Sequence, residues 1–229
     1  MNALLVDDER LARQELRRLL AAHPDVTIAG EAATADEAEA RLRDGDIDLL
    51  FLDIKMPGAS GFDLLERLES VPLLVFTTAY DEFALRAFDA NAFDYLLKPI
   101  HPDRLAATLQ KLRALRPKKA PTDRVFVRDG ERCWIVTLAD IALFEGEGNY
   151  ARACFGANRP LVRTSLNALE ARLDPAHFFR ASRRYIINLR FVEHVEPGVD
   201  DALSVKLRGG HIVEVSRRQS RKLRDTLGL

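Results

Sequence analysis

The stretch LLFLDIKMP, Leu49 to Pro57, decides the fold of the first half of the chain. Four apolar residues in a row are typical of a strand that is buried on both faces, as in a parallel sheet covered by helices. The run ends on one carboxylate, Asp53, after which Lys55 and a proline turn lead the chain away. We therefore expect Asp53 to lie at the edge of a sheet, fixed by a buried strand and accessible to a reactant.

Apolar runs alternate with helical patterns on both sides of this stretch. The runs ALLV, VTIAG, LLVF and YLL alternate with helix-like segments that include LARQELRRLL, GFDLLERL and FALRAF. A last helix is expected where Leu105, Leu109 and Leu112 share one face. Strands and helices at this spacing predict a doubly wound α/β fold, which is a parallel sheet with helices on both sides.

Polar side chains follow the apolar runs of this predicted sheet. Because ligands of such folds bind beyond the carboxyl ends of the strands, the informative residues are those that come next. They are Asp7, Asp8, Asp53, Thr77, Thr78 and Lys98. Three converging carboxylates repel one another, and a hard, oxygen-seeking ion such as Mg²⁺ relieves that repulsion. The set suits a phosphoryl group that arrives on Asp53 as nucleophile, although each residue alone is as well explained as a helix cap or a surface charge.

The charge of the chain is divided unevenly. Residues 1–120 carry 16 lysines and arginines against 21 aspartates and glutamates, whereas residues 121–229 carry 18 against 14. The break falls near RPKKAPTD, Arg116 to Asp123, whose prolines and basic pair are typical of an exposed linker. An acidic domain followed by a basic one is therefore predicted.

Composition also limits the compartment and the chemistry. No apolar run reaches the roughly 18 residues of a membrane helix, and the first residues lack the plan of a signal peptide. We therefore expect a cytoplasmic protein without a membrane partner. The cysteines, Cys133 and Cys154, match no metal-binding spacing and are expected to be buried.

Strand-like runs dominate the second half. VFVRDGERCWIV predicts a hairpin about Asp129–Gly130, and IALFEGEGNYARACF predicts a second hairpin. Further runs are LVRT, FFRA, FVEHVE, LSVKL and IVEVS, and helices are expected only at Ser165 to Leu173 and Arg217 to Leu227. Arginines cluster in RASRRYIINLR and SRRQSRKLR, a pattern that indicates nucleic-acid binding. For Lys222 and Arg224, a solvated helix face is the favoured explanation of the charge.

The segments LLVDDE, LLFLDIKMP, VFTTAY and DYLLKP stand in the order and spacing of the signature segments of two-component receiver domains, which residues 1–117 resemble. The resemblance implies a flavodoxin-like fold with Asp53 as phosphoacceptor. It implies that Asp8 binds Mg²⁺ directly, Asp7 largely through water, and Lys55 through its carbonyl. In a related phosphotransferase pattern, a second aspartate stands where this chain has Lys55, so we expect no enzymatic turnover.

The same resemblance implies a switch. Its members are the hydroxyl of Thr78, the aromatic ring of Tyr95 and the phosphate-contacting Lys98. A phosphoryl group adds charge and acceptor oxygens, which should draw in the hydroxyl and the lysine. The altered surface, built from DEFALRAF (residues 81–88), the neighbouring strand and the final helix, is where we expect two chains to pair. The aromatic residues on this face, Phe88 and Phe93, are expected to belong to the core.

Residues 124–229 resemble the LytTR type of DNA-binding domain through IALFEGEGNYARACF, TSLNALEARLDPAHFFRASRRYIINL and IVEVSRR. This resemblance implies an elongated, mainly β fold that reads DNA from loops instead of a recognition helix. Family members commonly have His-Arg-Ser where this chain has Ser182-Arg183-Arg184, so a frequent phosphate or base contact is altered. The residues implied in DNA contact are Asn149, Arg180, Arg183, Arg184, Tyr185, Ser216 and Arg217.

Together, the two halves predict a response regulator transcription factor with a receiver at residues 1–117, a linker at 118–123 and a DNA-binding domain at 124–229. We expect a histidine kinase to phosphorylate Asp53, receivers to form a homodimer, and two DNA-binding domains to grip a repeated or palindromic duplex site. Alternatively, the second domain binds protein or RNA and the receiver gates access to it. A preference for duplex DNA over single strands separates these hypotheses.

Overall fold

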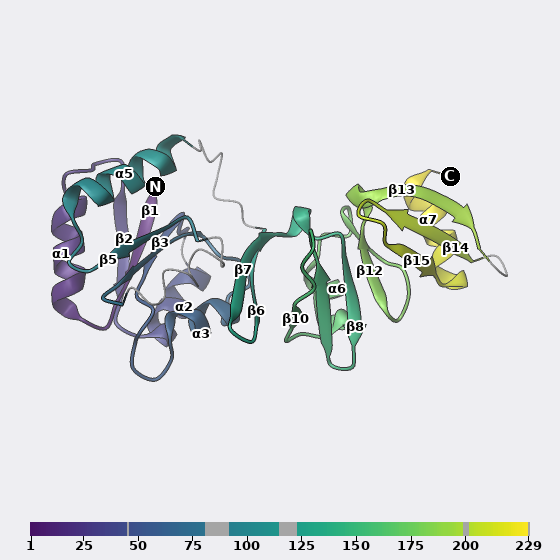
Figure 1. The fold of residues 1–229 in the computed structure, drawn as a ribbon, viewed down its shortest axis with the longest axis horizontal. Helices are drawn as coiled ribbons and strands as arrows, with labels where there is room; N and C mark the ends of the chain where they lie inside the picture. Colours follow the sequence, from purple (N-terminus) through teal and green to yellow (C-terminus); the bar gives the residue numbers. More distant parts are fainter. Residues whose placement is uncertain (45, 81–91, 115–122, 199–201, 229) are drawn as a thin grey trace. The chain divides into compact units, whose positions relative to one another are not determined.

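The structure is a computed structural model that describes residues 1–44, 46–80, 92–114, 123–198 and 202–228 (Figure 1). The chain forms two compact units, Met1–Val136 and Thr137–Leu229. The predicted helix at FALRAF and most of the predicted linker, residues 118–122, lie outside the described residues. No helix in the described ranges combines the length and apolar character needed to cross a bilayer.

The first unit is a parallel sheet between two layers of helices. Its strands lie in the order β2-β1-β3-β4-β5. They are β1 (Asn2–Val6), β2 (Thr27–Ala32), β3 (Leu49–Leu52), β4 (Leu73–Thr78) and β5 (Asp94–Leu97). The described helices are α1 (Arg10–Leu20), α2 (Ala35–Asp44), α3 (Gly61–Arg67) and α5 (Pro102–Ala114). The predicted doubly wound α/β fold is confirmed.

The central strand β3 shows why the LLFL run is apolar throughout. Because successive side chains of a strand point to opposite faces, Leu50 and Leu52 join the core with α2 and α3. Leu49 and Phe51 join the core with α1 and α5 on the other face. All four are fully buried. The strand has no solvent face, and this burial fixes the position of Asp53, which follows it.

Helix α3 begins in close contact with the end of β3. Ser60 and Asp63 form a reciprocal capping box, in which each side chain accepts a hydrogen bond from the backbone N–H of the other. The Gly61 N–H donates to the Ile54 carbonyl at 2.9 Å. A Cβ at Gly61 would collide with the backbone oxygen of Asp53. The approach of the helix to the Asp53 loop therefore requires glycine.

A hairpin of β6 (Arg124–Asp129) and β7 (Arg132–Thr137) turns at Gly130, as predicted, and packs on α3. The Phe126 ring stacks on Phe62 with 6.2 Å between centroids, and Arg128 forms an ion pair with Asp63 at 3.2 Å. The sequence placed a domain boundary before residue 124. Because the apolar side chains of this hairpin join the α3 core, the first compact unit extends to Val136.

The second unit is built mainly of antiparallel strands, as predicted. One sheet has the order β10-β9-β8-β12-β11 and the other the order β13-β14-β15 (Figure 1). Their strands are β8 (Leu143–Glu147), β9 (Tyr150–Cys154), β10 (Leu161–Val162), β11 (Phe178–Arg180), β12 (Tyr185–Asn188), β13 (Val192–Pro197), β14 (Leu203–Leu207) and β15 (Ile212–Val215). The YIIN run, which the sequence showed only as an apolar stretch, is β12, which lies between β8 and β11.

Short helical segments complete the second unit. Helix α6 (Leu166–Arg172) contacts β8 and β12, and α7 (Arg217–Leu227) adds Leu223 to a core shared by both sheets. The 3₁₀ helices in the described part of this unit are η2 (Leu138–Asp140) and η3 (Leu189–Phe191). Both α-helices lie where the sequence predicted them. Cys133 of the first unit and Cys154 of the second are both buried, as predicted, and form no disulfide with each other.

Candidate phosphoacceptor site and nucleic-acid interface

An acidic pocket lies at the carboxyl ends of the parallel strands. Oxygen atoms of Asp7, Asp8 and Asp53 lie within 4.8 Å of one another. The Lys98 ammonium lies 2.7 Å from a carboxylate oxygen of Asp7 and 2.7 Å from one of Asp53. Asp7 and Asp53 are each only 5% exposed. The structure thus brings the predicted carboxylates and the predicted lysine into one pocket.

Burial and charge compete in this pocket. Burial raises the pKa of Asp7 above its ordinary value, although hydrogen bonding to Lys98 opposes the rise. Burial alone would lower the pKa of Lys98, but its hydrogen bonds to Asp53 and Asp7 raise that pKa above its ordinary value. The lysine therefore remains charged. Three carboxylates face one ammonium group, an imbalance that a divalent cation corrects.

The donor set of the pocket fits a magnesium ion. All three side chains offer carboxylate oxygens, the ligands that hard cations prefer. Asp8 is more open than Asp7 and Asp53, which leaves one side for the waters that Mg²⁺ retains. The Lys55 N–H donates to Asp53 at 3.3 Å, so Lys55 lies beside the same carboxylate. A bound Mg²⁺ would neutralise negative charge next to Asp53.

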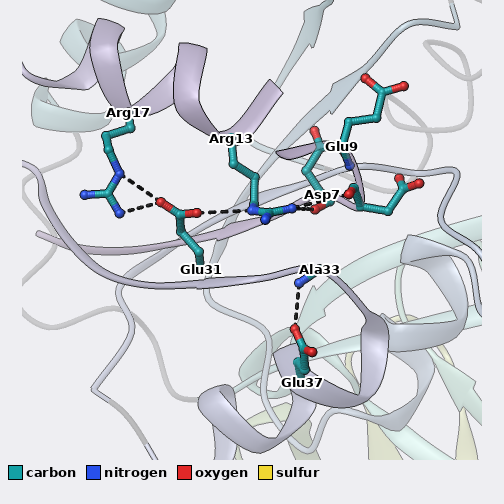
Figure 2. Close-up of polar contacts among 8 residues, drawn as sticks. Asp7, Glu9, Arg13, Arg17, Glu31, Ala33 and Glu37 are labelled. Carbon is teal, nitrogen blue, oxygen red and sulfur yellow. Dashed lines mark hydrogen bonds and ion pairs between the residues drawn. The ribbon is translucent and has the colours of Figure 1, made fainter. Parts of the chain in front are cut away.

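Arginines of α1 hold the loop that carries Asp7 and Asp8. The Arg13 guanidinium donates to the Asp7 carbonyl at 2.6 Å and to the Glu31 carboxylate at 3.1 Å. Figure 2 shows Arg13 between these two acceptors, with Arg17 on the other side of Glu31. Sequence reasoning missed this brace. The only signal in the sequence was the i, i+4 spacing of two arginines on one helix face.

The predicted switch residues lie on neighbouring strands. Thr78 ends β4, beside β3, and is fully buried. Its hydroxyl has no hydrogen-bond partner among the described residues, a state that costs about 1–3 kcal/mol. Acceptor oxygens added at Asp53 would satisfy this hydroxyl. Tyr95 of β5 is half-buried, and its hydroxyl donates to the Tyr80 carbonyl.

The predicted pairing surface is described only in part. Residues 81–88, including Phe88, lie outside the described residues. Phe93 is partly buried against the core of α1 and α5, in agreement with a core role. On β5, Leu97 is 47% exposed. The Asp94 carboxylate of the same strand accepts from Thr108 of α5 at 2.7 Å, which ties the strand to the final helix.

Magnesium is expected to raise the thermal unfolding midpoint of the protein. An ion that binds only the folded pocket stabilises it by mass action, by about 2.7 kcal/mol at roughly 100 times the dissociation constant. Scanning calorimetry across a Mg²⁺ series measures the effect. Asp8→Asn should abolish it, whereas Asp103→Asn, whose side chain is 94% exposed on α5, should not. An equal rise in the Asp8→Asn variant would contradict the predicted metal site.

Gly61→Ala is expected to destabilise the first unit by about 1–3 kcal/mol, since the new methyl group overpacks against backbone. It should also slow phosphorylation, because the backbone of Asp53 must shift. Urea unfolding and the rate of reaction with a small acyl phosphate measure the two effects. Gly30→Ala is the matched control, because its Cβ would meet side-chain atoms of Arg41 and Leu4 and no backbone, and its closest contact is the end of the flexible Arg41 side chain. Equal stability of the two variants would argue against a tight α3 contact.

Five of the seven predicted DNA-contacting residues lie on three adjoining segments of the second unit, and the other two, Arg180 and Tyr185, end β11 and begin β12 on either side of one of these segments. The three segments are the β8–β9 turn with Asn149, the turn at residues 182–184, and the start of α7. The Gly146 N–H donates to the Arg184 carbonyl at 2.7 Å, which joins the first two segments. The Ser216 N–H donates to the Ala181 carbonyl at 2.9 Å, which joins the last two.

Arg183 in the 182–184 turn and Arg180 just before it differ in their partners. Arg183 is exposed, and within the described part of the chain its guanidinium has no hydrogen-bond or ion-pair partner. Arg180 has a side chain only 13% exposed, which donates to the carbonyls of Ser182 at 2.6 Å and Arg183 at 3.0 Å. Arg180 therefore holds the turn from inside. The sequence pattern could not separate these roles, because it shows cations and not their partners.

Arg184 and Tyr185 both bind Glu145 of β8, a residue that the sequence reading missed. Arg184 donates to one Glu145 oxygen at 2.6 and 3.0 Å, and the Tyr185 hydroxyl donates to the same oxygen at 3.2 Å. Burial, and then the Glu145 charge, raise the pKa of Tyr185, which keeps its hydroxyl a donor. The observation that reveals Glu145 is the strand register, in which Tyr185 lies opposite Glu145.

The N-terminus of α7 has features that attract an anion. Ser216 is exposed at the N-cap and makes no capping hydrogen bond through its side chain to the described residues. Arg217 and Arg218 follow in the first turn. The N–H groups of a first helical turn and the positive end of the helix dipole favour phosphate at such a terminus. The position of Ser216 and Arg217 therefore agrees with a phosphate contact.

Comparison with known proteins agrees with this architecture. Residues 3–110 match the response regulator receiver domain, and residues 131–228 match the LytTr DNA-binding domain. Sensory transduction protein LytT of Enterococcus faecalis is 34% identical over 241 residues, and transcriptional regulatory protein BtsR of Escherichia coli is 34% identical over 242 residues. Each alignment covers 100% of both chains. The response regulatory domain of mrkE from Klebsiella pneumoniae shows 36% identity over 50% of this chain and 97% of its own, with a TM-score of 0.47.

A receiver joined to a DNA-binding domain defines the class as response regulators that act in transcription regulation. Within that class, the chain belongs to the LytTR family, which confirms the predicted relationship.

Proposed function

We propose that phosphorylation of Asp53 by a histidine kinase pairs two receivers and promotes sequence-specific binding of duplex DNA by the second unit. The observation that carries this proposal is the acidic pocket. In it, Asp53 is held 2.7 Å from Lys98, while the Thr78 hydroxyl lacks a partner among the described residues. An acyl phosphate on Asp53 would meet both groups. We propose that the protein acts in the cytoplasm, where it would meet both the kinase and the DNA.

The chemical step is a phosphoryl transfer from phosphohistidine. The Asp53 carboxylate forms the new P–O bond as the P–N bond breaks, and the freed imidazole nitrogen takes a proton from solvent. Lys98 supplies positive charge beside the transferred group. We propose that the chain is not an enzyme for small phosphate esters, because Lys55 occupies the place of a general acid–base carboxylate.

The switch would connect this step to pairing. The new oxygens draw the Thr78 hydroxyl toward Asp53 and give it the acceptor that it lacks among the described residues. Tyr95 then exchanges its bond to the Tyr80 carbonyl for an inward position. The surface of β5 and α5, with Leu97 exposed, changes with it and forms the homodimer contact.

Binding of DNA would use the three adjoining segments of the second unit. Arg183 offers a guanidinium that is unpaired among the described residues, and the start of α7 offers N–H groups for a phosphate. Asn149 lies exposed on the adjoining hairpin turn, where it can donate to a base edge. Two such modules at fixed spacing bind a repeated site more selectively than one.

Sedimentation velocity and fluorescence anisotropy test this proposal with the full chain, with and without Mg²⁺ and a small acyl phosphate. We expect the donor to shift the protein from monomer to dimer and to tighten binding to duplex DNA over single strands of the same sequence. Affinity should fall steeply with salt, since several phosphates are neutralised. Equal or tighter binding to single-stranded RNA would instead support an RNA-binding output domain.

A further inference from the structure

Arginines on the β8–β9–β12 face are paired with carboxylates of β8. The pairs are Arg152 with Glu147 at 2.5 Å, Arg184 with Glu145 at 2.6 Å, and Arg159 with Glu145 at 3.8 Å. Arg183, next to Arg184 in the same turn, has no such partner among the described residues. Of two neighbouring arginines in the proposed DNA-binding surface, Arg184 is therefore paired with a carboxylate and Arg183 is not, among the described residues.

The Glu145 side chain is largely buried and accepts hydrogen bonds from its neighbours. It is 15% exposed, whereas that of Arg184 is 67% exposed. One Glu145 oxygen accepts two hydrogen bonds from Arg184 and one from the Tyr185 hydroxyl. Tyr185 lies directly opposite Glu145 on the neighbouring strand. An exposed guanidinium is thus fixed from below by a largely buried carboxylate.

This pairing affects how arginine charge is offered to DNA. A guanidinium that binds phosphate strengthens binding to every duplex, because phosphates carry no sequence information. An additional free cation therefore raises non-specific affinity more than it raises selectivity. The Glu145 carboxylate neutralises Arg184 and, by its own charge, disfavours a phosphate at that position.

We propose that Glu145 is a specificity-determining positioning residue of the DNA-binding surface. It holds Arg184 and Tyr185 on the sheet, withholds the Arg184 charge from phosphates, and leaves Arg183 as the guanidinium that the turn offers to DNA. The inference rests on the proposed DNA-binding function. Glu145 would act by positioning Arg184 and Tyr185 and would not contact DNA itself.

The test compares the full-length wild type with Glu145→Gln, Arg184→Ala and the double variant, on a selected duplex and a scrambled duplex over a salt series. Glu145→Gln should bind the scrambled duplex about fivefold more tightly at 0.15 M salt and steepen the logarithmic salt slope by about 0.9, the effect of one added phosphate contact. Its selectivity ratio should fall. Arg184→Ala alone should change little. The double variant should return to the wild-type slope, because Arg159 lies 3.8 Å from Glu145, beyond hydrogen-bond distance, and is less affected by its loss than Arg184.

Glu196→Gln is the charge-matched control, because Glu196 is exposed on β13, in the other sheet. Thermal unfolding of each variant shows whether the fold is kept, and the Arg184→Ala arm tests the inference without removing Glu145. Any of three results would overturn it: a Glu145→Gln slope equal to that of Glu196→Gln, a steeper slope that persists in the double variant, or a full unit of slope lost in Arg184→Ala alone. A wild type that does not distinguish the two duplexes would instead overturn the proposed function, and this inference with it.

Discussion

Asp53→Asn is expected to abolish incorporation of a phosphoryl group from a small acyl phosphate donor. The amide cannot act as the oxygen nucleophile, although its size matches the carboxylate. Lys98 keeps its second contact, to Asp7 at 2.7 Å, so the pocket should remain assembled. The variant should therefore fold but show no donor-dependent pairing or gain in DNA affinity.

Intact-protein mass spectrometry after incubation with the donor and Mg²⁺ measures this directly. Wild type should gain the mass of one phosphoryl group, and Asp53→Asn should gain none. Asp36→Asn is the control, because the Asp36 side chain is 87% exposed at the start of α2. Phosphorylation of Asp53→Asn to the wild-type extent would place the acceptor on another residue.

Arg183→Ala is expected to cost about 1–3 kcal/mol of binding at a specific duplex if the guanidinium pairs with a base edge. The side chain is exposed and has no competing partner in the described ranges. Its loss should therefore weaken the DNA complex and leave the stability of the free protein almost unchanged. Binding to a scrambled duplex should change little. An equal loss on every duplex, with a shallower salt slope, would make Arg183 a phosphate contact instead.

The neighbouring arginine provides the matched comparison. Arg184→Ala removes the same group from the same turn, but that guanidinium is held by Glu145. Its effect on anisotropy-measured affinity should be much smaller than that of Arg183→Ala. If the two substitutions cost the same, the difference in their partners has no consequence for DNA binding.

The receiver pocket was largely predictable from the sequence, for a geometric reason. Parallel strands bring their carboxyl ends to one edge of the sheet, so residues that follow separate apolar runs must meet there. Asp7, Asp53 and Lys98 do meet. The constraints around them were not predictable, because the need for glycine at position 61 depends on how closely a helix approaches a strand end.

The fold class of the second unit was predictable from the sequence, but the pairing of its arginines with carboxylates was not. Apolar alternation and turn residues locate strands, and the mainly β fold followed from them. The state of an arginine depends instead on strand pairing across many residues, as between β8 and β12, which places Glu145 opposite Tyr185. The compact unit boundary at Val136 likewise depends on packing of Phe126 against α3, which no local pattern shows.

Selection from a random duplex DNA pool tests the central claim most directly. The full-length protein and Asp53→Asn would each be used with and without Mg²⁺ and a small acyl phosphate. We predict enrichment of a spaced double motif by the wild type, strengthened by the donor, with no such strengthening for Asp53→Asn. Enrichment of no sequence under any condition would contradict the account of this protein as a phosphorylation-controlled, sequence-specific DNA-binding regulator.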